Sequence, residues 1–271
     1  MQVGWKHLLR DAGYRLAPQL TTAVVSSRAR AHSAAFLKRS GLFDLNQTLI
    51  GEIGHKVLGG PFAGMELTSS AEQQHVGPYL LGTYEMELHR WVEECARGRF
   101  SQIVDVGSSF GYYAVGLARR FPQTPVIALD TDWWARRAVA EMASANGVTH
   151  VTIKSKCTPA WLEGDLQPNA LIISDCEGYE RALFFGPPVP ALATATLIVE
   201  LHEETPGELA AKFRERFSAT HAIDEVSGRA ATPRAQDIRT LTGPELDRVS
   251  HEIRGPQSWV FLRPLTRREA S

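Results

Sequence analysis

The sequence predicts an α/β fold built around one mostly parallel β-sheet. From about residue 100 onward, short β-branched runs alternate with helical stretches, which is the pattern of consecutive strand and helix units. These runs are apolar throughout instead of alternating with polar residues, as expected for strands that helices cover on both faces. The connections between the elements are short, which suits this architecture.

Seven strands are expected. The first five are buried runs at the centre of the sheet, and the last two are separated by a helix start at Thr242, Gly243, Pro244 and Glu245, with proline in its first turn. The expected strands cover residues 102–106, 126–130, 151–154, 170–175, 196–201, 221–226 and 257–262. The helices expected among the first strands cover residues 112–121, 134–145, 179–185 and 208–217.

Residues 1–82 are expected to form an N-terminal extension, and residues 83–271 the main domain. Residues 1–40 contain seven Lys and Arg side chains and one Asp, which predicts a basic helical arm. A solvated helix face is the common meaning of such a bias, and contact with a phosphate-bearing substrate is the alternative. The glycine-rich residues 49–68 favour a β-hairpin or close-packed lid, and residues 83–97 predict an amphipathic helix.

The overall composition is that of an ordinary globular protein. The chain has 271 residues, of which 44% are hydrophobic and 22% charged, and its formal net charge is -1. Nothing in this balance indicates a nucleic-acid partner. Charges are scattered through residues 1–20, so neither a signal peptide nor a membrane span is expected. The three cysteines lack the spacing of a zinc or redox motif, and a cytoplasmic location is the simplest expectation.

The most informative stretch is a strand, a glycine turn and a helix start at residues 103–116. A turn that binds a dinucleotide reads G-x-G-x-x-G, whereas here Gly107 and Gly111 are separated by three residues and Ser109 replaces the second glycine. The carboxylate of Asp105 would repel a pyrophosphate but would help to hold a positively charged aminoacyl group. This pattern favours S-adenosylmethionine over NAD. The expected binding residues are Asp105, Gly107, Ser108, Ser109 and Gly111.

A second carboxylate is predicted to bind the ribose of the cofactor. Asp130 ends the second strand, 25 positions after Asp105, where a carboxylate accepts hydrogen bonds from ribose hydroxyls. Capping of the next helix is the alternative role of Asp130. Thr131 follows as a further binding candidate, while Trp133 or Trp134 either flanks the adenine or packs at the helix start.

Three polar residues at the ends of the fourth and fifth strands are the candidate catalytic residues. Asp175 ends the fourth strand, and Glu200 and His202 end the fifth. Residues two apart on an extended chain share one face, and open α/β sheets bind ligands at this edge. We therefore expect an acid/base cluster, with a divalent-metal site and a structural histidine as the alternatives. Asp175 is also a candidate cofactor contact.

Two further sets of residues have open roles. Tyr84 and Glu85 precede the first strand and are candidates for the methionine end of the cofactor, although they equally fit as anchors of the helix that they begin. Glu177 is expected either to join the site or to cap the helix that starts near Tyr179, with Gly178 in the turn.

Three segments together resemble the class I S-adenosylmethionine-dependent methyltransferases, and within them the FkbM-type group. They are the glycine turn at residues 104–111, the run from Ile173 to Glu180, and the fifth strand at residues 198–202. Residues 60–65 and 81–85 are similar to the N-terminal region of a bacterial subset. The resemblance covers residues 55–265 and implies a Rossmann-like seven-stranded sheet with an antiparallel last strand. It also implies a cofactor at the carboxyl ends of the first two strands.

The resemblance implies transfer of a methyl group, usually to a hydroxyl of a small molecule such as a natural product or a sugar in bacterial secondary metabolism. The expected cofactor is S-adenosylmethionine, with a divalent metal as a weaker expectation. A second copy of the chain is a further candidate partner. The alternatives are an NAD-type oxidoreductase, an enzyme acting on nitrogen or carbon or without methyl transfer, and a non-catalytic regulatory protein that binds the cofactor.

Overall fold

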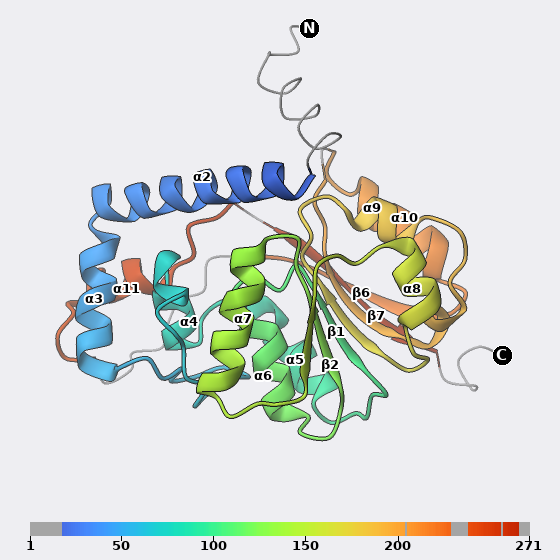
Figure 1. Cartoon of the computed structure of the whole chain (residues 1–271), viewed down its shortest axis with the longest axis horizontal. Coiled ribbons are helices and arrows are strands. Elements are labelled where there is room, and N and C mark those ends of the chain that lie inside the picture. The colour runs from blue at the N-terminus through green and yellow to red at the C-terminus, as the bar shows by residue number, and fades with distance from the viewer. Residues whose placement is uncertain (1–17, 204, 229–237, 256, 266–271) are drawn as a thin grey trace, which may run out of the picture.

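A seven-stranded sheet forms the centre of the molecule (Figure 1). The computed structural model describes residues 18–203, 205–228, 238–255 and 257–265. The strand order is β3-β2-β1-β4-β5-β7-β6, and β7 pairs antiparallel with both of its neighbours while β1 to β5 pair in parallel. This confirms the expected fold class and the antiparallel last strand. The strands are β1 Ile103–Val106, β2 Val126–Leu129, β3 Val151–Lys154, β4 Leu171–Ser174, β5 Thr196–Glu200, β6 His221–Ser227 and β7 Ser258–Pro264.

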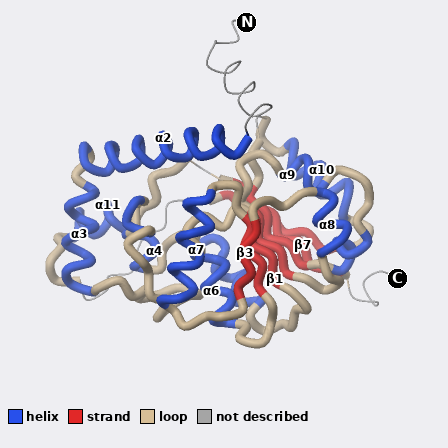
Figure 2. Tube along the Cα trace, in the orientation of Figure 1, coloured by secondary structure: helices blue, strands red, loops and turns tan. Residues whose placement is uncertain are grey.

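Helices cover both faces of the sheet, as the continuous apolar strands require (Figure 2). In β1, Ile103 joins the hydrophobic core on one face, whereas Val104 joins the core on the other. The first face is covered by α5 His89–Cys95, α6 Tyr112–Arg120 and α7 Trp133–Ala145. The second face is covered by α8 Pro159–Asp165, α9 Glu180–Phe184 and α10 Glu208–Phe217, with η3 Pro190–Thr194 beside them.

A further group of helices lies beside α7 and contains most of the N-terminal region (Figure 1). The predicted basic arm is helical where it is described, and Arg30 forms an ion pair with Asp132 at the start of α7. The guanidinium of Arg30 also lies 4.6 Å from the ring centroid of Trp134. Residues 1–17 of the arm lie outside the described residues. This group consists of α2 Pro18–Arg39, α3 Leu42–Ile53, η1 Ala71–Gln73, α4 Gly77–Leu81 and α11 Gly243–Ser250.

Two expectations about the N-terminal region are wrong in part. The glycine-rich segment begins in helix α3, which continues to Ile53, and the loop after it forms one isolated bridge, between Lys56 and Glu66. The helix expected at residues 83–97 starts only after Glu85, because Glu85 adopts a positive φ of 47° that a right-handed helix does not accommodate, and it consists of η2 Met86–Leu88 followed by α5. Among the described residues, no helix has the length and apolar character needed to cross a bilayer.

Candidate functional site

The glycine turn joins β1 to α6 and lies against the ends of β2 and β4. Gly107 and Gly111 have φ values of 86° and 96°, which favour glycine. A Cβ on Gly107 would lie 1.7 Å from the backbone oxygen of Asp175, and one on Gly111 would lie 3.3 Å from Cα of Val139. Both glycines therefore allow close packing of the protein on itself.

Asp105 and Ser108 present buried oxygen atoms beside this turn. One side of the Asp105 carboxyl accepts a hydrogen bond from the backbone N–H of Ala114 in α6, while Oδ2 has no partner among the described residues. Burial, together with the charges of Asp130 and Asp175, raises the pKa of Asp105 to about 8. The hydroxyl of Ser108 is also buried, and no described residue forms a hydrogen bond with it. A buried oxygen without a partner is costly unless a ligand supplies one.

Asp130 extends from the end of β2 toward the same turn. Its Oδ2 accepts a hydrogen bond of 2.9 Å from the backbone N–H of Ser109, and its Oδ1 accepts one of 2.8 Å from Asp132. Burial raises the pKa of Asp130. Each oxygen keeps capacity for a further hydrogen bond. The capping alternative is wrong, because Asp132 caps α7 by accepting a hydrogen bond from the backbone N–H of Trp134.

The residues that follow Asp130 in the sequence differ in how exposed their side chains are. Thr131 is exposed, and Trp133 is 54% exposed, so neither is shielded by the protein. Trp134 is half-buried beneath Arg30 of α2. The Arg30–Asp132 ion pair thus places the N-terminal helix next to the predicted ribose site. No periodicity in the sequence links Arg30 to Asp132, which are 102 positions apart.

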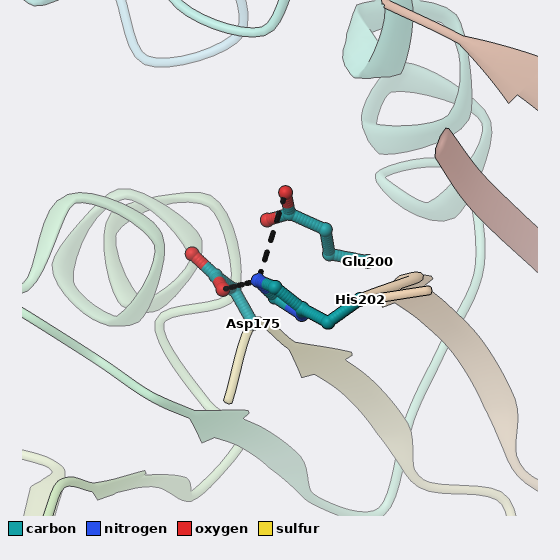
Figure 3. Close-up of side chains that lie close together, drawn as sticks. All are labelled: Asp175, Glu200 and His202. Carbon is teal, nitrogen blue, oxygen red and sulfur yellow. Dashed lines mark ion pairs between the residues drawn. The ribbon is translucent and has the colours of Figure 1, made fainter. Parts of the chain in front are cut away.

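Asp175, Glu200 and His202 converge at the ends of β4 and β5, as predicted (Figure 3). We call these three residues the β4–β5 cluster. One potential ligand atom from each residue lies within 4.8 Å of the other two. Nε2 of His202 lies 3.6 Å from Oδ1 of Asp175 and 4.0 Å from Oε1 of Glu200. The carboxyl groups of Asp175 and Glu200 are also close enough to share a hydrogen bond.

The β4–β5 cluster has strongly perturbed acid–base properties. Burial, reinforced by the charge of Glu177, raises the pKa of Asp175 to about 6, and burial together with Asp175 raises that of Glu200 to about 10. Burial lowers the pKa of His202, but the hydrogen bond to Glu180 and the surrounding carboxylates outweigh it, so the net shift is upward. Such shifts are typical of sites that move protons.

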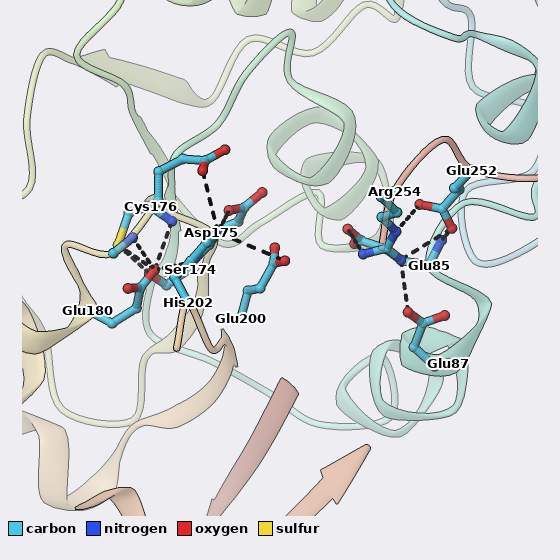
Figure 4. A network of polar contacts seen from close by, with 12 residues as sticks. Glu85, Glu87, Ser174, Asp175, Cys176, Glu180, Glu200, His202, Glu252 and Arg254 are labelled. Carbon is cyan, nitrogen blue, oxygen red and sulfur yellow. Dashed lines mark hydrogen bonds and ion pairs between the residues drawn. The ribbon is translucent and has the colours of Figure 1, made fainter. Parts of the chain in front are cut away.

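Glu180 is a member of this site that sequence reasoning does not identify. Its side chain is fully buried, and Oε1 lies 2.9 Å from Nδ1 of His202 (Figure 4). The same oxygen accepts longer hydrogen bonds from the backbone N–H groups of Cys176 and Gly178. The capping role expected for Glu177 is wrong, because Glu177 is 87% exposed in its side chain and α9 has no side-chain cap. Glu180 instead fixes the loop and the imidazole together.

A second group of charges forms around Arg254, which follows α11. We call Glu85, Glu87, Glu252 and Arg254 the Arg254 cluster (Figure 4). The guanidinium lies 3.6 Å from Glu85, 2.8 Å from Glu87 and 2.5 Å from Glu252. Burial raises the pKa of Glu85 to about 8 even though Arg254 lowers it. Tyr113 donates a short hydrogen bond to Glu85.

The Arg254 cluster holds Glu85 in place, and Tyr84 packs beside it. Glu85 is 1% exposed, its backbone N–H donates to Glu252 over 2.8 Å, and its side chain does not cap the following helix. Tyr84 stacks on Tyr79 with ring centroids 3.9 Å apart. The two clusters influence each other, because the charge of Glu85 raises the pKa of Glu200. Glu87, Glu252 and Arg254 carry no sequence motif that would have identified them.

A cleft of about 420 Å³ opens between α2, α4 and the loop that carries Arg254. Tyr84 and Arg254 line it together with His32, Phe36 and Tyr79. Its volume lies within the range of small-molecule sites, about 300–1,000 Å³. A second cavity of about 520 Å³ lies between α9 and α10 and is lined by other residues, among them Phe185 and Lys212. The first cleft is the one that adjoins the predicted site.

No protein-family model matches the sequence, and no curated protein matches it significantly. Similar folds occur among solved structures. A precorrin-6y C5,15-methyltransferase from Geobacter metallireducens is 12% identical, with 66% of this chain and 90% of that one covered at a TM-score of 0.46. An rRNA methylase from Streptococcus thermophilus is also 12% identical, with 68% and 99% covered at a TM-score of 0.47. At these identities the similarity concerns the fold alone.

Proposed function

We propose that the chain is an S-adenosylmethionine-dependent methyltransferase that acts on a hydroxyl of a small molecule. The observation that carries the proposal is the buried Oδ2 of Asp105, which lies beside the glycine turn and has no hydrogen-bond partner in the part of the chain that the structure describes. An ammonium group of the cofactor would supply the missing partner. Asp130, at the end of the neighbouring strand β2, has lone pairs for the ribose hydroxyls.

The residues of the chain fit this cofactor better than a dinucleotide. Asp105 and Asp130 place two carboxyl groups around the turn, which can accept hydrogen bonds from an ammonium group and from ribose hydroxyls, whereas a pyrophosphate offers them no donor. Gly107, Ser108, Ser109, Gly111 and Thr131 remain the proposed backbone and side-chain contacts. Tyr84 and Glu85 are proposed to border the methionine end, and Asp175 to face the reacting group from the end of β4.

Methyl transfer to oxygen needs an in-line arrangement and a place for the hydroxyl proton. S-Adenosylmethionine supplies the methyl group. The β4–β5 cluster supplies proton acceptors at the same edge of the sheet, with His202 held by Glu180 at 2.9 Å. In this proposal Asp175, Glu200 and His202 are the catalytic residues, and Glu180 is a positioning residue. The acceptor would enter from the cleft that Tyr84 and Arg254 line.

Calorimetry with S-adenosylmethionine and S-adenosylhomocysteine tests the cofactor. We expect saturable binding of both to the full chain, and binding weakened by about ten-fold or more in Asp130→Ala, because hydrogen bonds to a charged group contribute about 1.5–3 kcal/mol. Asp224→Ala on the edge strand β6 is the matched control. Absence of binding to folded protein would reject the proposal, and unchanged binding by Asp130→Ala would reject the ribose assignment.

The choice of oxygen as acceptor needs a separate measurement. Methyl-labelled cofactor is incubated with the protein and a panel of hydroxyl-bearing natural products and sugars, and products are identified by mass spectrometry. We expect a methyl ether. A product methylated on nitrogen or carbon would retain the methyltransferase and discard the oxygen acceptor. Tight cofactor binding without turnover on any acceptor would favour the regulatory alternative.

A further inference from the structure

Three electron-pair donor atoms of the β4–β5 cluster point at one small space (Figure 3). They are a carboxylate oxygen of Asp175, a carboxylate oxygen of Glu200 and Nε2 of His202, mutually within 4.8 Å. Glu200 is 1% exposed, and its Oε2 has no hydrogen-bond partner among the described residues. Oδ1 of Asp175 also lacks a partner. Such a convergence of lone pairs around one buried carboxyl group favours a proton or a cation between them.

Glu180 fixes which nitrogen of His202 faces this space. Its buried carboxylate lies 2.9 Å from Nδ1, so the imidazole donates its Nδ1–H there and turns the lone pair of Nε2 toward Asp175 and Glu200. A histidine that binds a metal characteristically donates its other ring N–H to a carboxylate in this way. The contact is independent of the three converging atoms, since it lies on the opposite side of the ring.

The separations suit coordination. Two ligands on a tetrahedral ion at about 2.0–2.1 Å are about 3.3–3.4 Å apart. Nε2 of His202 is 3.6 Å from Asp175 and 4.0 Å from Glu200, so each of these two pairs needs a movement of only a few tenths of an ångström to reach one ion, and all three ligand atoms lie within 4.8 Å of one another. Exposed Glu177, also 3.6 Å from Nε2, adds negative charge on the solvent side. The Arg254 guanidinium is engaged by three other carboxylates.

We propose that Asp175, Glu200 and His202 bind one divalent transition-metal ion. One imidazole and two carboxylates form a mixed nitrogen and oxygen set, which suits Mn²⁺ or Zn²⁺ better than soft Cu⁺. A role for the ion in catalysis rests on the proposed function: it would lower the pKa of a hydroxyl that it contacts, replacing His202 as the group that favours loss of the proton. The binding site itself does not depend on methyl transfer.

Mn²⁺ binding to the full chain without an affinity tag tests the site, with electron paramagnetic resonance and equilibrium dialysis as readouts. We expect one Mn²⁺ per chain, displaced by Zn²⁺. Asp175→Asn, Glu200→Gln and His202→Asn should each weaken binding at least ten-fold, and Glu180→Gln by about 10–100-fold because it releases the imidazole. Glu177→Gln removes the same charge from the exposed position and should change affinity less than three-fold. Circular dichroism checks that every variant is folded.

Two results would overturn the site: no saturable binding of Mn²⁺ or Zn²⁺ to the folded wild type, or a loss in Glu177→Gln as large as that in Glu200→Gln, which would indicate a diffuse acidic surface. Calorimetry with S-adenosylmethionine on the same preparations separates this inference from the proposed function. Cofactor binding without metal binding rejects the metal site alone. Metal binding without cofactor binding rejects the proposed function alone.

Discussion

The β4–β5 cluster and the Arg254 cluster are both rich in carboxyl groups, but they differ in whether a cationic side chain pairs with those groups. In the Arg254 cluster, three carboxylates surround one guanidinium, and the charges of these carboxylates outweigh burial and raise the pKa of Arg254. In the β4–β5 cluster, a buried carboxyl group, a half-exposed one and an imidazole converge, and within the described residues Oδ1 of Asp175 and Oε2 of Glu200 have no hydrogen-bond partner.

This difference separates a structural role from a chemical one. Charges that are paired within the chain hold segments together, here the start of η2 and the loop after α11. Charges that are left without a partner are costly, and they persist where a ligand, a proton or an ion completes them. The comparison therefore assigns anchoring to the Arg254 cluster and chemistry to the β4–β5 cluster.

The largest expected effect is on the Arg254 cluster. Arg254→Met leaves three partly or fully buried carboxylates without their cation, so we expect the free energy of unfolding to fall by about 3–5 kcal/mol. Urea denaturation measures it. Arg263→Met is the control, because Arg263 is 40% exposed in its side chain and its ion pairs with Glu94 and Asp224 are on the surface. That control should lose less than about 1 kcal/mol.

In contrast to Arg254→Met, Glu200→Gln should not destabilise the chain when urea denaturation is measured with a chelator present to remove metal ions. It keeps the shape of a buried side chain whose pKa is raised to about 10, and it replaces a carboxyl that is costly to ionise there with a neutral amide, so the free energy of unfolding should stay the same or rise. If Glu200→Gln destabilised the chain as much as Arg254→Met, the two clusters would share a structural role and the comparison would fail.

A smaller effect on stability is expected at two glycines near Asp175: Gly107, which packs against its backbone, and Gly178, three residues after it. Gly107→Ala places a Cβ 1.7 Å from the backbone oxygen of Asp175 at a φ of 86°, so the turn must shift as well as bear strain. We expect a loss of about 3 kcal/mol or more of unfolding free energy. Gly178→Ala has a similar φ of 93° but nothing within 4 Å of the added Cβ, and should cost about 1–2 kcal/mol. Equal losses would mean that contact with Asp175 is unimportant.

Most of the fold could be predicted because the signals that determine it are local. Each expected strand lies within two residues of an observed one, since a run of buried apolar residues is itself what the sheet requires. Helix α3 was harder, because Gly51 lies inside it and indicates a loop. The burial of Leu42 and Leu49 outweighs that preference, which is about 1 kcal/mol relative to alanine.

The site could be predicted only where residues share a strand end. Asp175, Glu200 and His202 follow from the rule that parallel strands meet at one edge. Glu180 is 22 positions from His202, and Arg254 is 169 positions from Glu85, so their contacts depend on packing that no spacing encodes. The positive φ of Glu85 is equally invisible in the sequence, because tertiary contacts with Arg254 and Tyr113 hold it.

The smallest expected effect is the pH dependence of stability that His75 causes through its contact with the loop before Arg254. His75 lies 3.0 Å from the backbone oxygen of His251, and its other ring nitrogen lies 3.2 Å from the side-chain amide of Asn46. Burial lowers the pKa of His75 to about 4. The unfolded chain therefore takes up a proton near pH 6.5, while the folded chain resists it until about pH 4. Stability is complete above pH 6.5 and falls as the pH drops through this window.

We expect a loss of up to about 3 kcal/mol from this residue between pH 6.5 and 4, since one pKa unit corresponds to about 1.4 kcal/mol. His75→Gln keeps a donor and an acceptor but cannot be protonated, so it should remove this part of the pH dependence. Urea denaturation of both proteins at several pH values measures the difference, in which the contributions of the other histidines cancel. Parallel curves would show that His75 binds protons equally in both states. The loop that carries Arg254 would then be held by its ion pairs without help from a neutral imidazole.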